Sequence, residues 1–161
     1  MAEDDSMHRT DEDVAAFIAA SARAETLARV DAVLREAMPG APRTLWRGVF
    51  WGGTEQAIIG YGDLVQPRPR GRSADWFLIG LAEQQAHVSL YVNAVEDGAY
   101  LARTYADRLG RVRTGAASIA FKRIEDLDLT VLAEMAAHAA RSLPGDAGGT
   151  GDGTGPDGLK G

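Results

Sequence analysis

The sequence predicts an α+β domain in which helices pack on one face of a mainly antiparallel sheet. Short runs rich in β-branched and aromatic residues occupy the middle of the chain, and turn residues such as Gly52-Gly53 separate them. Segments with helical spacing of apolar residues lie before and after these runs. Strands joined by short connections pair antiparallel, and helices grouped at the two ends of the chain are typical of a layered α+β fold.

Two helices are expected ahead of the strands. The first begins near Val14, and Thr10 or Asp11 is expected to cap it. The second has one apolar face, formed by Leu27, Val30, Leu34 and Ala37. The Pro-Gly-Ala-Pro segment at 39–42 ends this helix, because proline cannot continue a helical hydrogen-bond ladder.

Four strands are then expected, over residues 45–51, 57–61, 76–81 and 87–92, with turns at 52–53, 62–63 and 67–72. The last of them alternates, with Val88, Leu90 and Val92 on one side and His87, Ser89, Tyr91 and Asn93 on the other. This alternation predicts a sheet with one packed face and one wetter face. Trp76 and Phe77 are interpreted as core aromatics.

The remaining elements are a short helix, a strand and a final helix. The helix is expected over 99–109 and the strand over 117–121. Acidic residues at 126–128 suit the positive N-terminal end of the last helix. Its apolar stripe consists of Leu129, Leu132, Ala136 and Leu143.

The two ends of the chain differ from its middle in composition. Residues 1–13 carry six acidic side chains and few apolar ones, and residues 144–161 contain eight glycines and two prolines. Such segments bury too little apolar surface to offset the entropy of ordering, so both are expected to be disordered around a single domain over 14–143. The ends supply the acidity: the middle has a formal charge of +1, against −6 for the whole chain. An anion-binding domain is therefore compatible with the acidic isoelectric point.

Composition also excludes several classes of function. The chain has no cysteine, which removes disulfides, thiol nucleophiles and thiolate metal sites. An acidic start and the lack of a long apolar run predict a cytoplasmic protein without a membrane anchor. Nucleic acid is not an expected partner, because the middle is nearly neutral and the ends would repel phosphate. No cofactor is expected, and a monomer and a homodimer both remain open.

Residues 110–115 have the spacing of a phosphate-binding loop without its chemistry. Gly110 and Gly115 give the G-x-x-x-x-G pattern, but Ala116 and Ala117 follow where lysine and a hydroxyl residue are required. A strand is expected next, whereas the phosphate loop needs a helix whose N-terminus faces the phosphate. The segment is therefore interpreted as a connection into a strand.

Basic residues gather in two loops and form the main candidate site. The candidate ligand-binding residues are Arg68, Arg70, Arg72, Asp75, Tyr91, Arg111, Arg113 and Lys122. If the arginines and Lys122 converge, they make a site for a small anion or an acidic protein partner. The alternative is a solvated basic surface. Asp75 is also a candidate to pair with Arg72 or another arginine and fix the preceding loop.

Two other hypotheses stay open. Asp11, Glu12 and Asp13 form an exposed acidic cluster for a hard cation such as iron, or simply a helix start favoured by the dipole. An enzyme acting on a small anionic substrate would use Arg72, Asp75 and Lys122 to bind and orient it. No catalytic motif supports this hypothesis, so the prediction leans towards a non-catalytic binding or accessory domain. His87 is interpreted as a surface residue.

Several short motifs resemble the YdhG-like domain family of small bacterial proteins. They are Gly60-Tyr61-Gly62, Gly71-Arg72, Asp75-Trp76-Phe77, Leu78-Ile79-Gly80-Leu81, Leu90-Tyr91, Leu109-Gly110, Thr114-Gly115, Phe121-Lys122-Arg123 and Asp126-Leu127-Asp128-Leu129. The resemblance covers about 14–143 and implies a compact α+β domain related in shape to frataxin-like proteins. Some relatives are described as intracellular iron chaperones, and others have no assigned function. This chain departs from the family at Leu64, Gln66 and Arg68, where relatives often carry tyrosines, and at Ala116, where they carry lysine.

Overall fold

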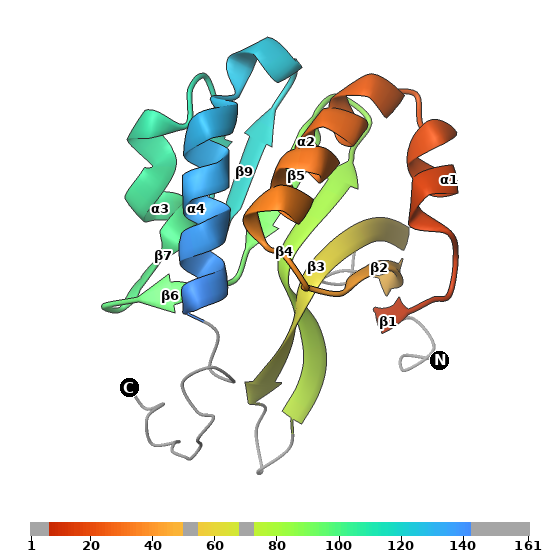
Figure 1. The fold of residues 1–161 in the computed structure, drawn as a ribbon, viewed down its shortest axis with the longest axis horizontal. Helices are drawn as coiled ribbons and strands as arrows, with labels where there is room; N and C mark the ends of the chain where they lie inside the picture. The colour runs from red at the N-terminus through yellow and green to blue at the C-terminus, as the bar shows by residue number, and fades with distance from the viewer. Residues whose placement is uncertain (1–6, 50–54, 68–72, 143–161) are drawn as a thin grey trace.

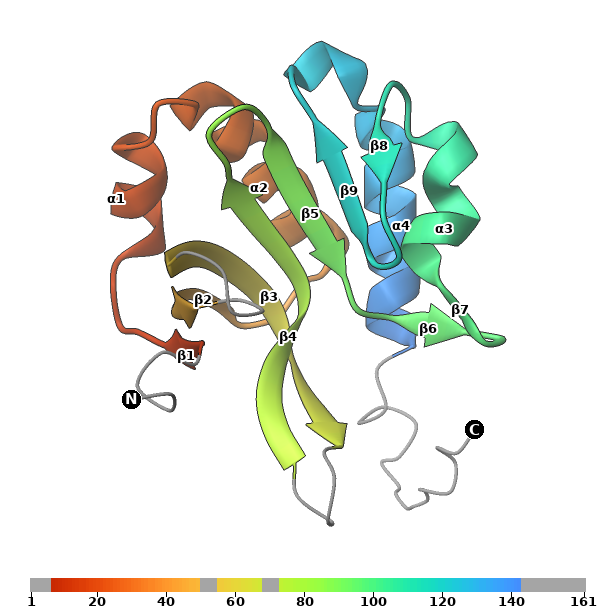
Figure 2. The same cartoon turned by 180° about the vertical axis from the view of Figure 1, so that it is seen from behind.

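The computed structural model describes residues 7–49, 55–67 and 73–142. Its elements are β1 (His8–Arg9), α1 (Val14–Ala19), α2 (Ala24–Ala37), β2 (Arg43–Val49), β3 (Glu55–Pro67), β4 (Ser73–Glu83), β5 (Val88–Val92), β6 (Val95–Glu96), β7 (Ala99–Tyr100), α3 (Leu101–Tyr105), β8 (Arg113–Thr114), β9 (Ser118–Phe121) and α4 (Leu129–Arg141). In this part of the chain, seven strands form one antiparallel sheet in the order β1-β2-β3-β4-β5-β9-β8, and β6 and β7 form a separate hairpin. Helices α2 and α4 lie across one face of the sheet (Figure 1), and the view from behind shows the strands in front of them (Figure 2). The α+β fold class predicted from the sequence is confirmed.

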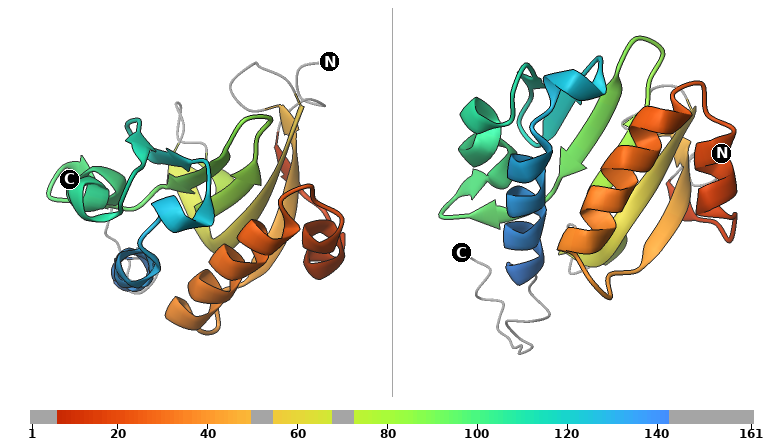
Figure 3. Two further views of the ribbon diagram at one scale, coloured as in Figure 1. Left: turned by 90° about the horizontal axis from the view of Figure 1, so that it is seen from above. Right: turned by 45° about the horizontal axis from the view of Figure 1, so that its top comes forward.

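The main core lies between the sheet and the two long helices. Leu27 and Leu34 of α2, Leu90 of β5, and Leu132 and Met135 of α4 are fully buried in one cluster. Figure 3 shows α2 and α4 on the same side of the sheet. The alternation expected in β5 is also confirmed, because its valines and leucine point into this cluster while its tyrosine packs on the opposite side.

The second face of the sheet carries a smaller aromatic cluster. Trp76 and Phe77 stack with their ring centroids 4.3 Å apart, and the Trp46 ring meets both edge-on. Two glycines on neighbouring strands make room for the Phe77 side chain: a Cβ on Gly60 would lie 2.7 Å from Phe77 Cβ, and one on Gly80 would lie 2.5 Å from the Phe77 ring. The two glycines are therefore explained by close packing. Phe77 is a core residue as expected, but of this second cluster.

The hairpin of β3 and β4 is longer than the sequence indicated. The predicted turn at 62–63 lies within β3, and pairing with β4 continues to the Pro67–Ser73 pair. Gly62 has a φ of +80°, so a turn residue here bends the strand without ending it. The extended part of the hairpin projects away from the helices (Figure 1). Arg9 of β1 holds its base through ion pairs with Asp63 at 3.2 Å and Asp75 at 3.0 Å.

The folded domain begins earlier than predicted. β1 pairs with β2, and the Thr10 hydroxyl donates to the Leu45 carbonyl at 2.8 Å, so residues 8–13 belong to the fold. The boundary at 14 was placed too late because the segment is anchored by backbone pairing and leaves little apolar signal. Asp13, and not Thr10 or Asp11, caps α1 by accepting from the Ala16 N–H at 3.0 Å. Residues 1–6 and the tail at 144–161 lie outside the described residues.

Candidate functional site

A pocket of about 720 Å³ opens where β5 begins and β9 ends. Four basic residues line it: His87, Arg111, Arg113 and Lys122. We call this site the basic pocket. It brings together three residues that the sequence analysis selected as candidates, from two segments, and adds His87.

Strand pairing explains how residues from three segments meet. Val88 of β5 pairs with Phe121 of β9, so the next positions outward, His87 and Lys122, stand at the same end of the two strands. Arg113 of β8 pairs with Ala120 of β9, one step further in. The sequence analysis interpreted His87 as a surface residue, because a single strand does not reveal which strand will lie beside it.

Arg111 is held at the pocket by a crossing of two loops. Its N–H donates to the Asp126 carbonyl at 2.7 Å, and the Asp128 N–H donates to the Leu109 carbonyl at 2.7 Å. Gly110 has a φ of +111°, and a Cβ there would lie only 2.3 Å from the Asp126 carbonyl oxygen. Only glycine fits this crossing, which explains the first glycine of the phosphate-loop pattern in structural terms. β8 and β9 follow it, as the expected connection into a strand requires.

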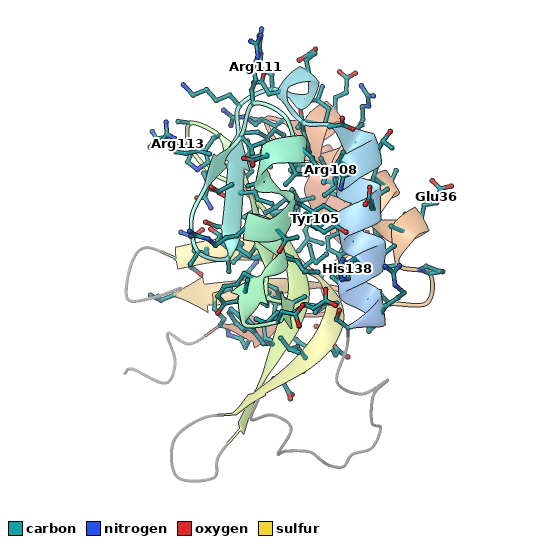
Figure 4. All side chains as sticks on the ribbon, turned by 90° about the vertical axis from the view of Figure 1, so that its left-hand side faces the viewer. Glu36, Tyr105, Arg108, Arg111, Arg113 and His138 are labelled. Atoms are coloured by element: carbon teal, nitrogen blue, oxygen red, sulfur yellow. The ribbon has the colours of Figure 1, made fainter. Side chains whose placement is uncertain are left out.

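The permanent cations of the basic pocket have free side chains. Arg111, Arg113 and Lys122 are exposed, and within the described residues none of the three side chains has an ion pair or a hydrogen-bond partner. Other basic side chains do pair with carboxylates: Arg9, Arg23, Arg35, Arg43, Arg47 and Arg108. Figure 4 shows Arg111 at one end of the molecule and Arg113 to the side of the sheet, and both line the pocket. Free guanidinium and ammonium groups at a pocket are suited to bind an oxyanion.

One carboxylate also lines the basic pocket. Asp126 contributes to its wall, and its side chain accepts a hydrogen bond from the Arg123 N–H at 3.3 Å. Three permanent cations against one carboxylate leave the pocket with an excess of positive charge, which attracts anions.

The other predicted ligand residues lie elsewhere or outside the described residues. Asp75 pairs with an arginine outside the basic pocket, Arg9, at the base of the β3–β4 hairpin. Tyr91 lies on the second face of the sheet, where Gln84 donates to its hydroxyl at 3.3 Å and burial raises its pKa. Neither lines the basic pocket. Arg68, Arg70 and Arg72 fall outside the described residues. The enzyme hypothesis needs Asp75 beside Lys122, and the structure does not bring these two together.

Two of the three acidic residues proposed for a metal, Glu12 and Asp13, make other contacts. Glu12 forms a two-point ion pair with Arg47, at 2.5 and 2.9 Å, and this contact lowers the pKa of Glu12. Asp13 caps α1. The described residues contain no group of three His, Cys, Asp or Glu side chains placed to hold a metal ion. The geometry around Asp11, Glu12 and Asp13 thus matches a charged helix start.

A second cavity, of about 580 Å³, lies at the end of α2, and two of its charged lining residues, Arg35 and Arg43, pair with Asp31. Asp31 of α2, only 6% exposed, accepts from Arg43 Nη1 at 2.9 and 2.7 Å and from the Tyr61 hydroxyl at 2.6 Å. Arg35, one turn along α2, lies 3.7 Å from the same carboxylate. This network joins α2 to β2 and β3, and we interpret it as structural.

The Tyr61 hydroxyl is expected to contribute to unfolding at alkaline pH. Burial, and then the nearby Asp31 carboxylate, raise the pKa of Tyr61 well above its ordinary 10.0. The folded state thus keeps a proton that the unfolded state loses, so this stabilisation is complete below about pH 10 and falls as pH rises further. Between pH 10 and 11, the unfolding free energy of the unaltered protein should fall with pH more steeply than that of Tyr61→Phe. The two slopes should differ by up to about 1.4 kcal/mol per pH unit. Urea unfolding at several pH values measures this, and Tyr100→Phe, at an exposed tyrosine, should leave the slope unchanged.

A Tyr-His-Glu arrangement between α3, α4 and β6 was missed by the sequence analysis. The Tyr105 hydroxyl lies 2.8 Å from His138 Nδ1, and His138 Nε2 lies 2.5 Å from a Glu96 oxygen (Figure 4 labels the first two). Burial raises the pKa of Tyr105, which opposes its activation as a nucleophile. The contact joins the β6–β7 hairpin to α4 and is interpreted as a structural clamp.

Comparisons of the chain with protein families, with curated proteins and with solved structures each gave no match. The YdhG-like resemblance therefore stays a prediction from the motifs. Helices of the described part of the chain are too short or too polar to cross a membrane.

Proposed function

We propose that this protein is a non-catalytic, cytoplasmic binding domain whose basic pocket takes an anionic ligand or an acidic group of a protein partner. The observation that carries the proposal is the gathering of Arg111, Arg113 and Lys122 around one pocket, where their side chains have no partner among the described residues. A cation that pairs within its own domain is not available to a ligand, and these three are available. Arg9 at the hairpin base and Arg35 of α2 are not part of the proposed binding site, because both already pair with carboxylates.

Electrostatics support an anion over other ligands. The excess of positive charge at the pocket raises the local concentration of anions and weakens with added salt. The lining residues include no serine or cysteine nucleophile, so the pocket supports binding more directly than catalysis.

The double variant Arg111→Ala and Arg113→Ala is expected to abolish stabilisation of the protein by anions. A ligand at 100 times its dissociation constant adds about 2.7 kcal/mol to the stability of the folded state, and removing two of three cations should eliminate most of it. Thermal-shift measurements at low salt, with inorganic phosphate, citrate and a hexaglutamate peptide, test this. Arg29→Ala with Arg103→Ala is the matched control, because both are exposed arginines outside the pocket and the charge change is the same.

Loss of the anion effect in the pocket variant alone supports the proposal. Equal loss in both double variants would indicate a general effect of net charge, and the proposal would then be wrong. The same conclusion follows if none of the three anions stabilises the unaltered protein at concentrations up to the millimolar range.

A further inference from the structure

We infer that the natural ligand of the basic pocket is a small organic oxyanion with an apolar body, such as a phosphate ester or carboxylate of an aromatic or short aliphatic group. The inference rests on the proposed function and narrows it. It depends on which uncharged residues line the same pocket, on the pocket's size, and on the shape of the sheet edge beside it.

An apolar wall lies directly beside the cations. Ala86, Val112, Ala120 and Phe121 line the basic pocket together with its charged residues. A site for a fully hydrated inorganic anion gains nothing from such a wall, whereas an organic ligand buries apolar surface against it. The volume of about 720 Å³ falls within the range of about 300–1,000 Å³ that is typical of small-ligand pockets.

The register of β8 and β9 places charge and apolar surface one residue apart. Arg113 pairs with Ala120, and Lys122 directly follows Phe121. Arg111 and Arg113 line the pocket on either side of Val112 in the sequence, and Val112 is partly buried against the core. A ligand whose oxyanion meets the exposed cations therefore has its uncharged part directed towards Val112 and Ala120.

The sheet edge beside the pocket argues against an acidic peptide. A peptide that binds by strand addition needs a run of free backbone groups along an edge strand. The edge strand β8 has only two residues, and the Val112 N–H ahead of it already donates to the Gly110 carbonyl at 3.0 Å. Such a short edge strand offers a peptide few backbone groups for hydrogen bonding. A compact ligand therefore fits this site better.

Isothermal titration calorimetry of the full chain with phenyl phosphate, inorganic phosphate and a hexaglutamate peptide tests the inference. We expect phenyl phosphate to bind at least about tenfold more tightly than inorganic phosphate, because burying about 60 Å² of apolar surface has this effect. We expect the peptide to bind more weakly than phenyl phosphate. Citrate and benzoate extend the series to carboxylates and show which oxyanion is preferred.

Ala86→Leu tests the contribution of the apolar lining to binding separately from that of the basic residues. Ala86 is exposed in the turn between β4 and β5, so a larger side chain there narrows the pocket without disturbing the core. The variant should lose most of the preference for phenyl phosphate and keep its affinity for inorganic phosphate. Ala120→Leu narrows the pocket from β9 and should act in the same direction, with its melting temperature as the check on folding.

The outcomes distinguish this inference from the proposed function. Equal affinity for phenyl phosphate and inorganic phosphate, or tighter binding of the peptide, would overturn the inference while the anion-binding function stands. A phenyl phosphate preference that survives both leucine variants would also overturn it. Absence of binding by every anion would refute the inference and the proposed function together.

Discussion

Replacing Arg43 with alanine should lower the free energy of unfolding by about 3 kcal/mol or more. The change removes the two hydrogen bonds that Arg43 Nη1 donates to Asp31 and leaves a carboxylate that is almost fully buried with only Tyr61 as a close donor. Breaking one side of a buried ion pair costs about 3 to 5 kcal/mol because the remaining charge is uncompensated. Arg43 keeps some contact with solvent, so the lower end of this range applies. Chemical denaturation at neutral pH measures the effect.

Two further variants identify the cause of that loss. Arg29→Ala, at an exposed position on α2, should change stability by less than about 0.5 kcal/mol. Arg43→Met combined with Asp31→Asn removes both charges and should recover part of the loss of Arg43→Ala, because no charge is then left buried without a partner. A loss below about 1 kcal/mol in Arg43→Ala would show that water or Arg35 replaces the ion pair.

Gly110→Ala is expected to destabilise the protein by about 3 kcal/mol or more and to weaken anion binding at the basic pocket. A side chain is strained at a φ of +111°, and its Cβ would lie 2.3 Å from the Asp126 carbonyl oxygen. Backbone strain costs about 1–3 kcal/mol, and relief of the overlap costs a similar amount. The relief must separate the two loops, which breaks the hydrogen bond that places Arg111.

Gly98→Ala is the matched control for that variant. Gly98 also has a positive φ, of +79°, but a Cβ there would meet no atom within 4 Å. It should therefore show the strain alone, about 1 kcal/mol, and leave anion binding unchanged. Equal losses of stability in the two variants would mean that the loop crossing adapts to a side chain, and the crossing would then not be what holds Arg111.

The basic pocket could be predicted only in part, because some of its residues are close in sequence and another is brought in by pairing between distant strands. Arg111 and Arg113 alternate with Val112, which indicates that they project to one side, and Lys122 follows the next strand along the chain. His87 joins them through the pairing of β5 with β9, which no local pattern specifies. Strands joined by a short connection are readily predicted to be neighbours. The pairing of β5 with β9 is harder to predict, because a helix, α3, lies between them in the sequence.

The remaining site predictions depended on long-range contacts. Asp75 is expected from the sequence to pair with Arg72 or another arginine, and the structure gives it Arg9, in a segment that composition alone assigns to a disordered leader. The β3–β4 pairing carries Asp75 to the hairpin base, far along the strand from the basic pocket. The general fold was easier to predict, since hydrophobic periodicity is repeated along each long element. The pattern identifies the element even when its ends are misplaced by a few residues.

The crossing of residues 109–111 with 126–128 also bears on the order in which the pocket assembles during folding. The two backbone bonds close a short stretch of chain that contains β8 and β9, so little chain entropy is lost when they form. Arg111, Arg113 and Lys122 all lie within this closed stretch, whereas His87 lies outside it, before β5. We therefore expect the three permanent charges to be gathered by this local unit of the chain, and His87 to join them when β9 pairs with β5.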